Sequence, residues 1–164
     1  MAKPIKKSVT TVCRTLDDTD LEILRILQED GRISSVDLAF KVKLSAASVG
    51  ARLKRLQNDG VITGFTARLN ARELSLGLLV FVTVDLKEMS KKGFDAFTGG
   101  VQKAPEILEC YMLIRGSYLL KVRVKDMDTY RDFIERVICK LPNVREAHSQ
   151  VVMEETKPFG PLRI

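Results

Sequence analysis

The spacing of apolar residues changes about 70 residues into the chain. In the first part they recur three or four positions apart, which is typical of amphipathic helices, and in the second part several short runs alternate, as strands with one buried face do. Residues 1–15 are polar and follow neither period. The pattern predicts a flexible arm over residues 1–15, a helical domain over 16–69, a linker over 70–77, a mixed domain over 78–157 and a tail over 158–164.

Three short helices are predicted in the helical domain. Short side chains that carry an oxygen atom accept hydrogen bonds from the free N–H groups of a helix start, and an Asp-Gly pair ends a helix well. The expected caps are Asp17 or Asp18, then Ser34 or Ser35, then Ser45, and the expected ends are Asp30-Gly31 and Asp59-Gly60. Three short helices with a tight turn before the third form a helix-turn-helix domain. Residues 61–69 are expected to be extended.

The mixed domain is predicted to have the order β-α-β-β-α-β. The expected strands are 78–86, an alternation of Leu108, Cys110, Met112 and Ile114, then 118–124 and 144–153; one helix is expected around Phe94, Phe97 and Val101, and another after the cap Asp126. This order is that of a ferredoxin-like domain. The fold class predicted for the chain is therefore α+β, with a helix-turn-helix domain followed by a ferredoxin-like βαββαβ domain.

Charge adds a candidate partner. The 164 residues carry a net charge of +6, and residues 1–15 hold four basic side chains and no acid. Residues 16–70 are neutral, yet from Leu38 to Asn58 five basic residues are accompanied by no acid. Such a local basic surface favours a polyanion. A solvated lysine-rich surface would have the same composition, and the basic arm could either contact phosphates or act as a solubilising tail.

The third predicted helix is the sharpest functional feature. Its inward positions are Val49, Leu53 and Leu56, and small residues at its start would let its backbone approach base edges in the major groove. The candidate DNA-binding residues are Ser45, Ala46, Ala47, Ser48, Ala51, Arg52, Lys54 and Arg55. Basic residues on the later turns fit phosphate contacts. The alternative is a solvent-facing helix of a domain that binds protein.

Several classes of protein are disfavoured by what the sequence lacks. It shows no glycine-rich phosphate loop, no nucleophile with a base and no apolar run of about 18 residues, so neither an enzyme nor a membrane span is predicted. His148 is the single histidine and is interpreted as structural. Cys13, Cys110 and Cys139 lack metal-ligand spacing, and the last two are interpreted as core residues. No metal or cofactor is expected, and a reducing cytoplasm is the expected compartment.

Motifs in a fixed order identify a family resemblance. They include Leu16-Asp17-Asp18-Thr19-Asp20, Gln28-Glu29-Asp30-Gly31-Arg32-Ile33, Arg52-Leu53-Lys54-Arg55-Leu56, Gly64-Phe65-Thr66, Glu109-Cys110, Tyr118-Leu119-Leu120-Lys121-Val122-Arg123-Val124, Leu141-Pro142 and Val151-Val152-Met153-Glu154-Glu155. In this order the chain resembles the Lrp/AsnC, or feast/famine, transcriptional regulators from Leu16 almost to its end. The last motif resembles most closely the leucine-responsive branch.

The resemblance implies a winged helix-turn-helix that binds double-stranded DNA and a RAM/ACT-like effector domain. It also implies dimers formed through the sheets, often assembled into octamers, a free amino acid bound between subunits, and regulation of amino-acid metabolism on the nucleoid in the cytoplasm. The residues that it implies for the effector are Gly116, Ser117, Tyr118, Met127, Gln150 and Val151.

The sequence departs from the family pattern in three respects. Ala46 and Ser48 stand where the family usually has prolines, and Ala51 stands where a basic or polar residue is frequent. The second hairpin reads Gly116-Ser117-Tyr118-Leu119-Leu120, two residues shorter than the family's Gly-Asp-Tyr-Asp-Tyr-Leu-Leu and without its acids. We therefore expect a weak or absent response to leucine. The alternatives to a DNA-binding regulator are an amino-acid-sensing regulatory subunit of a metabolic enzyme and a protein-binding scaffold.

Overall fold

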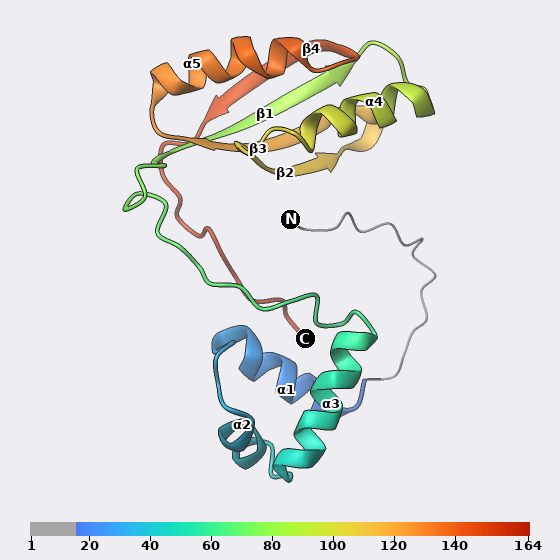
Figure 1. Ribbon diagram of the computed structural model, residues 1–164, viewed down its shortest axis with the longest axis vertical. Helices are drawn as coiled ribbons and strands as arrows, with labels where there is room; N and C mark the ends of the chain where they lie inside the picture. The colour runs from blue at the N-terminus through green and yellow to red at the C-terminus, as the bar shows by residue number, and fades with distance from the viewer. Residues whose placement is uncertain (1–15) are drawn as a thin grey trace. The chain divides into compact units, whose positions relative to one another are not determined.

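The computed structural model describes residues 16–164, so the predicted basic arm and Cys13 lie outside the described residues (Figure 1). The described chain forms two compact units. One unit runs up to Ala67 and also contains Phe159–Ile164, and the other is Arg68–Pro158. The last residues, predicted as a tail, thus belong to the helical unit. No helix among residues 16–164 is long and apolar enough to cross a bilayer.

Three helices build the first unit: α1 (Asp18–Glu29), α2 (Ser35–Lys41) and α3 (Ala46–Asn58). Each begins at a side-chain cap. Asp17 caps α1 in a capping box with Asp20, Ser34 caps α2, and Ser45 caps α3 by accepting from the backbone of Ser48. These caps satisfy N–H groups that would otherwise lack partners at each helix start.

The core of the helical unit is small. Ile23, Leu38, Ala39, Val49 and Leu56 are buried, with partly buried apolar side chains around them. Lys43 adopts a positive φ of 55° in the turn between α2 and α3, where the backbone of Leu44 donates to that of Ala39. Residues 61–69, expected to be extended, form no strand with any described residue. The core therefore fixes α3 against α1 and α2.

The second unit has the expected element order. It consists of β1 (Leu78–Leu86), α4 (Lys91–Val101), β2 (Ile107–Met112), β3 (Tyr118–Val124), α5 (Met127–Arg136) and β4 (Val144–Val151), with short 3-10 turns η1 (Ile114–Gly116) and η2 (Ile138–Lys140). The strands lie in the order β2-β3-β1-β4, and every neighbouring pair is antiparallel. This is the ferredoxin-like arrangement that the alternation predicted.

Both helices cover the same face of this sheet (Figure 1). Val82 of β1 and Leu120 of β3 point into the core, where they meet Phe97 of α4 and Phe133 of α5. Side chains point to alternate faces along a strand, so the intervening residues form a second face that no helix covers. We call this the open face; it carries Phe81, Thr83, Asp85, Glu109, Leu119, Lys121, Arg123, Glu146, His148 and Gln150.

Two expectations about the second unit are wrong. Leu108, Met112 and Ile114 were expected on a buried strand face, but all three are exposed, Ile114 to 93%. The pairing of β2 with β3 shifts register between Ile107 and Glu109, and Ile114 lies in η1 beyond the strand, so the alternation does not continue. Cys139, interpreted as a core residue, is exposed, whereas Cys110 is half-buried.

Candidate DNA-binding surface and ligand-binding domain

The exposed face of α3 is smooth at its start and cationic further along. Val49 and Leu56 are buried on the core side. On the opposite side, small or basic residues are exposed at helical spacing: Ala46, Ala47, Gly50, Ala51 and Lys54. A Cβ atom added at Gly50 would meet nothing within 4 Å, so this glycine leaves a shallow place in the surface. We call these five residues the exposed face of α3.

Two arginines of α3 are bound to α1. The Arg52 guanidinium donates from one nitrogen to Asp17, at 2.6 Å, and to Asp20, at 2.8 Å. Arg55 donates to the other carboxylate oxygen of Asp20. The Asp20 carboxylate is fully buried, whereas the side chains of Arg52 and Arg55 are 26% and 49% exposed. The ion pairs therefore fix the orientation of α3 relative to α1.

The same contacts stabilise the charged forms of Asp17 and Arg52. The hydrogen bond from Arg52, followed by the one from the Asp20 backbone, holds the pKa of the Asp17 carboxyl below its ordinary value. Hydrogen bonds to Asp17 and then Asp20 raise the pKa of Arg52. Both effects follow from opposite charges in contact. Arg52 therefore keeps its charge while that charge is largely compensated inside the domain.

The eight predicted DNA-binding residues thus occupy different places. Ala46, Ala47, Ala51 and Lys54 lie on the exposed face of α3. Ser45 is the exposed cap and Ser48 is partly buried beside it. Arg52 and Arg55 lie on the flank that meets α1. Gly50 was missed, although its four-residue spacing from Ala46 and Lys54 would have placed it on this face.

The residues that the resemblance implied for the effector do not form one pocket within one chain. Gly116 and Ser117 precede β3 at one end, whereas Met127 follows the other end of β3. Gln150 lies opposite Phe81 on the open face, and its neighbour Val151 therefore points to the other face. The six residues are brought together only if more than one chain contributes to the site.

The Gly116–Tyr118 segment packs against other residues of its own domain. The Tyr118 ring is buried 4.7 Å from the ring of Phe97, between centroids, so within one chain it packs in the core of its domain. Gly116 has a φ of 79°, and a Cβ atom there would collide with Met89. Burial of these two residues leaves Ser117 as the partly accessible residue of the segment.

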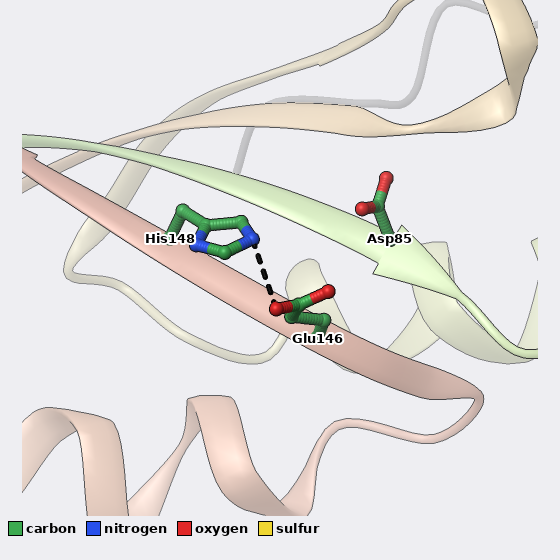
Figure 2. A group of neighbouring side chains, drawn as sticks. All are labelled: Asp85, Glu146 and His148. Carbon is green, nitrogen blue, oxygen red and sulfur yellow. Dashed lines mark ion pairs between the residues drawn. The ribbon is translucent and has the colours of Figure 1, made fainter.

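A group of potential metal ligands, which was not predicted, lies at the β1–β4 edge of the open face. One ligand atom each from Asp85, Glu146 and His148 lies within 4.8 Å of the other two (Figure 2). Asp85 is the cross-strand partner of Glu146, and His148 is two residues further along β4. The sequence shows Glu146 and His148 two apart, but the third member depends on strand register, which the sequence does not contain.

Both units of the chain are similar to domains of known proteins. Residues 16–63 match the family model for winged helix-turn-helix DNA-binding domains, and residues 79–162 match that for the Lrp/AsnC ligand binding domain. The leucine-responsive regulatory proteins of Salmonella typhimurium and Escherichia coli K12 are each 44% identical over 92% of this chain and 93% of their own length. The chain belongs to the Lrp/AsnC family of transcriptional regulators.

Solved structures agree with this assignment. A transcriptional regulator from Neisseria meningitidis in complex with L-Met matches with a TM-score of 0.84 and 34% identity, over 91% of this chain and 97% of that one. An AsnC family regulator from Agrobacterium tumefaciens matches with a TM-score of 0.81 and 35% identity, over 87% and 93%. The predicted family, the predicted fold and the role as a DNA-binding transcriptional regulator are confirmed.

Proposed function

We propose that this Lrp/AsnC regulator binds duplex DNA by placing the exposed face of α3 in the major groove. The proposal rests on the small exposed residues Ala46, Ala47, Gly50 and Ala51, which lie on the same face of α3 as Lys54. Asp20 of α1 fixes the helix in place by binding Arg52. A groove about 12 Å wide admits a helix, and small side chains allow its backbone to come close to base edges.

The polar residues at the start of α3 have a separate role in the proposal. The first N–H groups of a helix and its positive dipole end attract phosphate. Ser45 and Ser48 lie at this end, and Lys54 lies two turns further on. Ser45, Ser48 and Lys54 would therefore bind the backbone of the duplex on both sides of the groove contact, which positions the helix without selecting a sequence.

Arg52 and Arg55 support binding chiefly by positioning α3. Their guanidinium groups are engaged by α1, yet both side chains remain partly exposed and still contribute positive potential at the edge of the surface. Removing either arginine is thus expected to affect both the stability of the helical unit and its affinity for DNA. Removing Lys54 is expected to affect affinity alone.

A dimer formed through the open face fits the second unit. Only one face of the sheet is covered by helices, and the other carries apolar side chains such as Phe81 and Leu119 among ion pairs such as Lys121–Glu109. A two-fold dimer would present two copies of α3 to half-sites separated by about 10–10.5 base pairs or a multiple. Assembly of dimers into octamers is part of the same proposal.

The proposed signal is a free amino acid bound between subunits, and the proposed targets are genes of amino-acid metabolism, read on the nucleoid in the cytoplasm. The leucine-responsive relatives and the L-Met complex of the Neisseria regulator support this choice of ligand class. The shortened hairpin at Gly116-Ser117 offers no acid for an amino-acid ammonium group, so we expect weak or no leucine binding. Micromolar affinity for leucine in calorimetry would overturn that expectation. We propose no catalytic activity.

The test of the DNA contact uses the full chain and a duplex selected from genomic fragments by binding. In gel shifts at one fixed salt concentration, Gly50→Gln should lose at least about tenfold in affinity, because a longer side chain holds the helix away from base edges. Lys140→Ala, an exposed lysine of η2, serves as the control and should bind normally. Unchanged binding by Gly50→Gln would place the contact elsewhere and contradict the proposal.

A further inference from the structure

We propose that Asp85, Glu146 and His148 form a binding site for a divalent transition-metal ion of the Zn²⁺ class on the open face of the sheet (Figure 2). The inference does not depend on how the protein binds DNA. It rests on three observations about this one cluster: the backbone register that assembles it, the unfavourable charge pair within it, and the ligand types that it offers.

Strand register brings the three side chains together. Asp85 of β1 and Glu146 of β4 are direct cross-strand partners, so their side chains leave the same face. His148 follows Glu146 by two residues and therefore points to that face as well. In Figure 2, Glu146 and His148 face each other along β4, with Nε2 of His148 3.2 Å from Oε1 of Glu146, and Asp85 lies beside them on β1.

The two acids need a positive charge between them. Like charges directly opposite each other on antiparallel strands destabilise the pair. Arg145 supplies one cation, but its guanidinium is 3.6 Å from Asp85 and its side chain is 63% exposed, so this pair is weak. A divalent ion between the carboxylates would remove the repulsion and use the nitrogen lone pair of His148.

The donor set indicates which ion fits. Imidazole nitrogen suits Zn²⁺, Ni²⁺ and Cu²⁺, whereas Mg²⁺ and Ca²⁺ prefer oxygen alone. One nitrogen and two carboxylates, each about 2.0–2.2 Å from a shared tetrahedral ion, require donor atoms about 3.3–3.6 Å apart, closer together than the 4.8 Å limit within which they lie. Within one chain the three side chains are between about a third and 60% exposed, and in a dimer formed through the open face they would lie at the subunit interface. Three protein ligands leave at least one position to water.

The experiment uses the full chain in its own assembly, freed of metal by chelation and of any affinity tag by cleavage. Because His148 is the single histidine of the sequence, its imidazole gives one identifiable set of NMR signals. We expect ZnCl₂ to shift these signals and calorimetry to show one saturable site per chain. His148→Gln and Asp85→Asn should each weaken binding by at least about 100-fold, since even changes that only touch a ligand cost 10–100-fold. Asp128→Asn, an exposed acid of α5, is the matched control and should bind normally.

Two further measurements show whether a loss of metal binding is due to unfolding and whether the metal binds to cysteine thiols instead. Saturating Zn²⁺ should raise the thermal midpoint of the unmodified protein and leave that of His148→Gln unchanged, because a ligand stabilises only the state that it binds. Co²⁺ should bind without the near-ultraviolet thiolate absorption that the cysteines would give. The proposal is overturned by the absence of saturable binding, by unmoved imidazole signals, or by undiminished binding in folded His148→Gln.

Discussion

The guanidinium of Arg52 lies 2.8 Å from the carboxylate of Asp20, a residue 32 positions earlier in the chain. The carboxylate is fully buried and also binds Arg55, so one acid of α1 holds two turns of α3. A helix that enters a groove must keep its orientation to read bases. In the proposed mode of binding, Asp20 thus contributes to DNA recognition although it lies behind the surface that would contact the DNA.

Asp20→Asn should destabilise the helical unit by about 2 kcal/mol. This is less than the about 3–5 kcal/mol measured when a fully buried pair is broken, because the two partly exposed arginines can turn to water. Urea unfolding followed by circular dichroism measures the change. Asp18→Asn, an exposed acid of the same turn, should cost no more than about 1 kcal/mol. Equal losses in the two variants would show that the ion pairs do not hold α3.

The variants Arg52→Ala and Lys54→Ala should distinguish a residue that positions α3 from one that only contacts DNA. Both are expected to weaken operator binding by about 1–3 kcal/mol, as loss of a cationic contact does. Of the two variants, Arg52→Ala alone should also lower the free energy of unfolding, because Arg52, unlike Lys54, is seen to bind Asp17 and Asp20. Lys54→Ala should reduce the salt dependence of binding by about one released ion. Affinity measured at several salt concentrations, with unfolding on the same samples, decides; unchanged operator affinity in Arg52→Ala would refute its role.

Gly50→Ala should stabilise the helical unit by up to about 1 kcal/mol. Alanine is the better helix former, and the added methyl group would meet no atom within 4 Å. The thermal midpoint of the variant reports this gain. A loss of stability would mean that the backbone at Gly50 requires glycine for folding, and its place on the exposed face of α3 would then have another explanation.

Cys139 should react with iodoacetamide well before Cys110 in the native protein. Cys139 is exposed, whereas burial raises the pKa of the Cys110 thiol to about 11, which leaves little reactive thiolate at pH 8. Mass spectrometry of peptides after timed labelling measures both sites. In urea the two rates should converge. Equal rates in the folded protein would contradict the burial of Cys110.

Asp17→Asn should have an effect that depends on pH. The folded pKa of Asp17 is held below its ordinary value of 3.8, chiefly by Arg52, so its contribution to stability is present above that pH and is lost as the pH falls through the folded pKa. The difference in thermal midpoint between the protein and the variant should thus be constant above about pH 5 and narrow below pH 4. A difference that persists at pH 2.5 would show that the charge of Asp17 is not its cause.

Local chemistry explains which features could be predicted. The caps at Ser45 and Asp126 depend on neighbours within three residues, and the family motifs are local strings, so both are visible in the sequence. The partners of Arg52 are not local, and nothing in the third helix shows that its arginines bind Asp20. The same limit hid the group around His148, because Asp85 joins it only through the pairing of β1 with β4.

The strand β2 shows a second limit. Alternating apolar residues predicted the buried face from Leu108 to Ile114, but a register shift after Ile107 breaks the alternation. The bulge leaves Leu108 without a partner on β3 and exposed, whereas Cys110 lies opposite the buried Leu120. No residue type in this stretch predicts the register shift. The strand and the inward position of Cys110 were therefore predictable, whereas the exposure of Leu108 was not.

The helical unit is completed by residues from the far end of the sequence. Gln28 of α1 accepts from the Leu162 backbone at 2.6 Å and donates to its carbonyl at 3.2 Å, and Arg25 donates to the carbonyl of Ile164. Arg25 and Gln28 are synthesised 139 and 134 residues before Ile164 and Leu162, their respective partners. The helical unit can therefore form these contacts only after all four strands of the second unit have been synthesised.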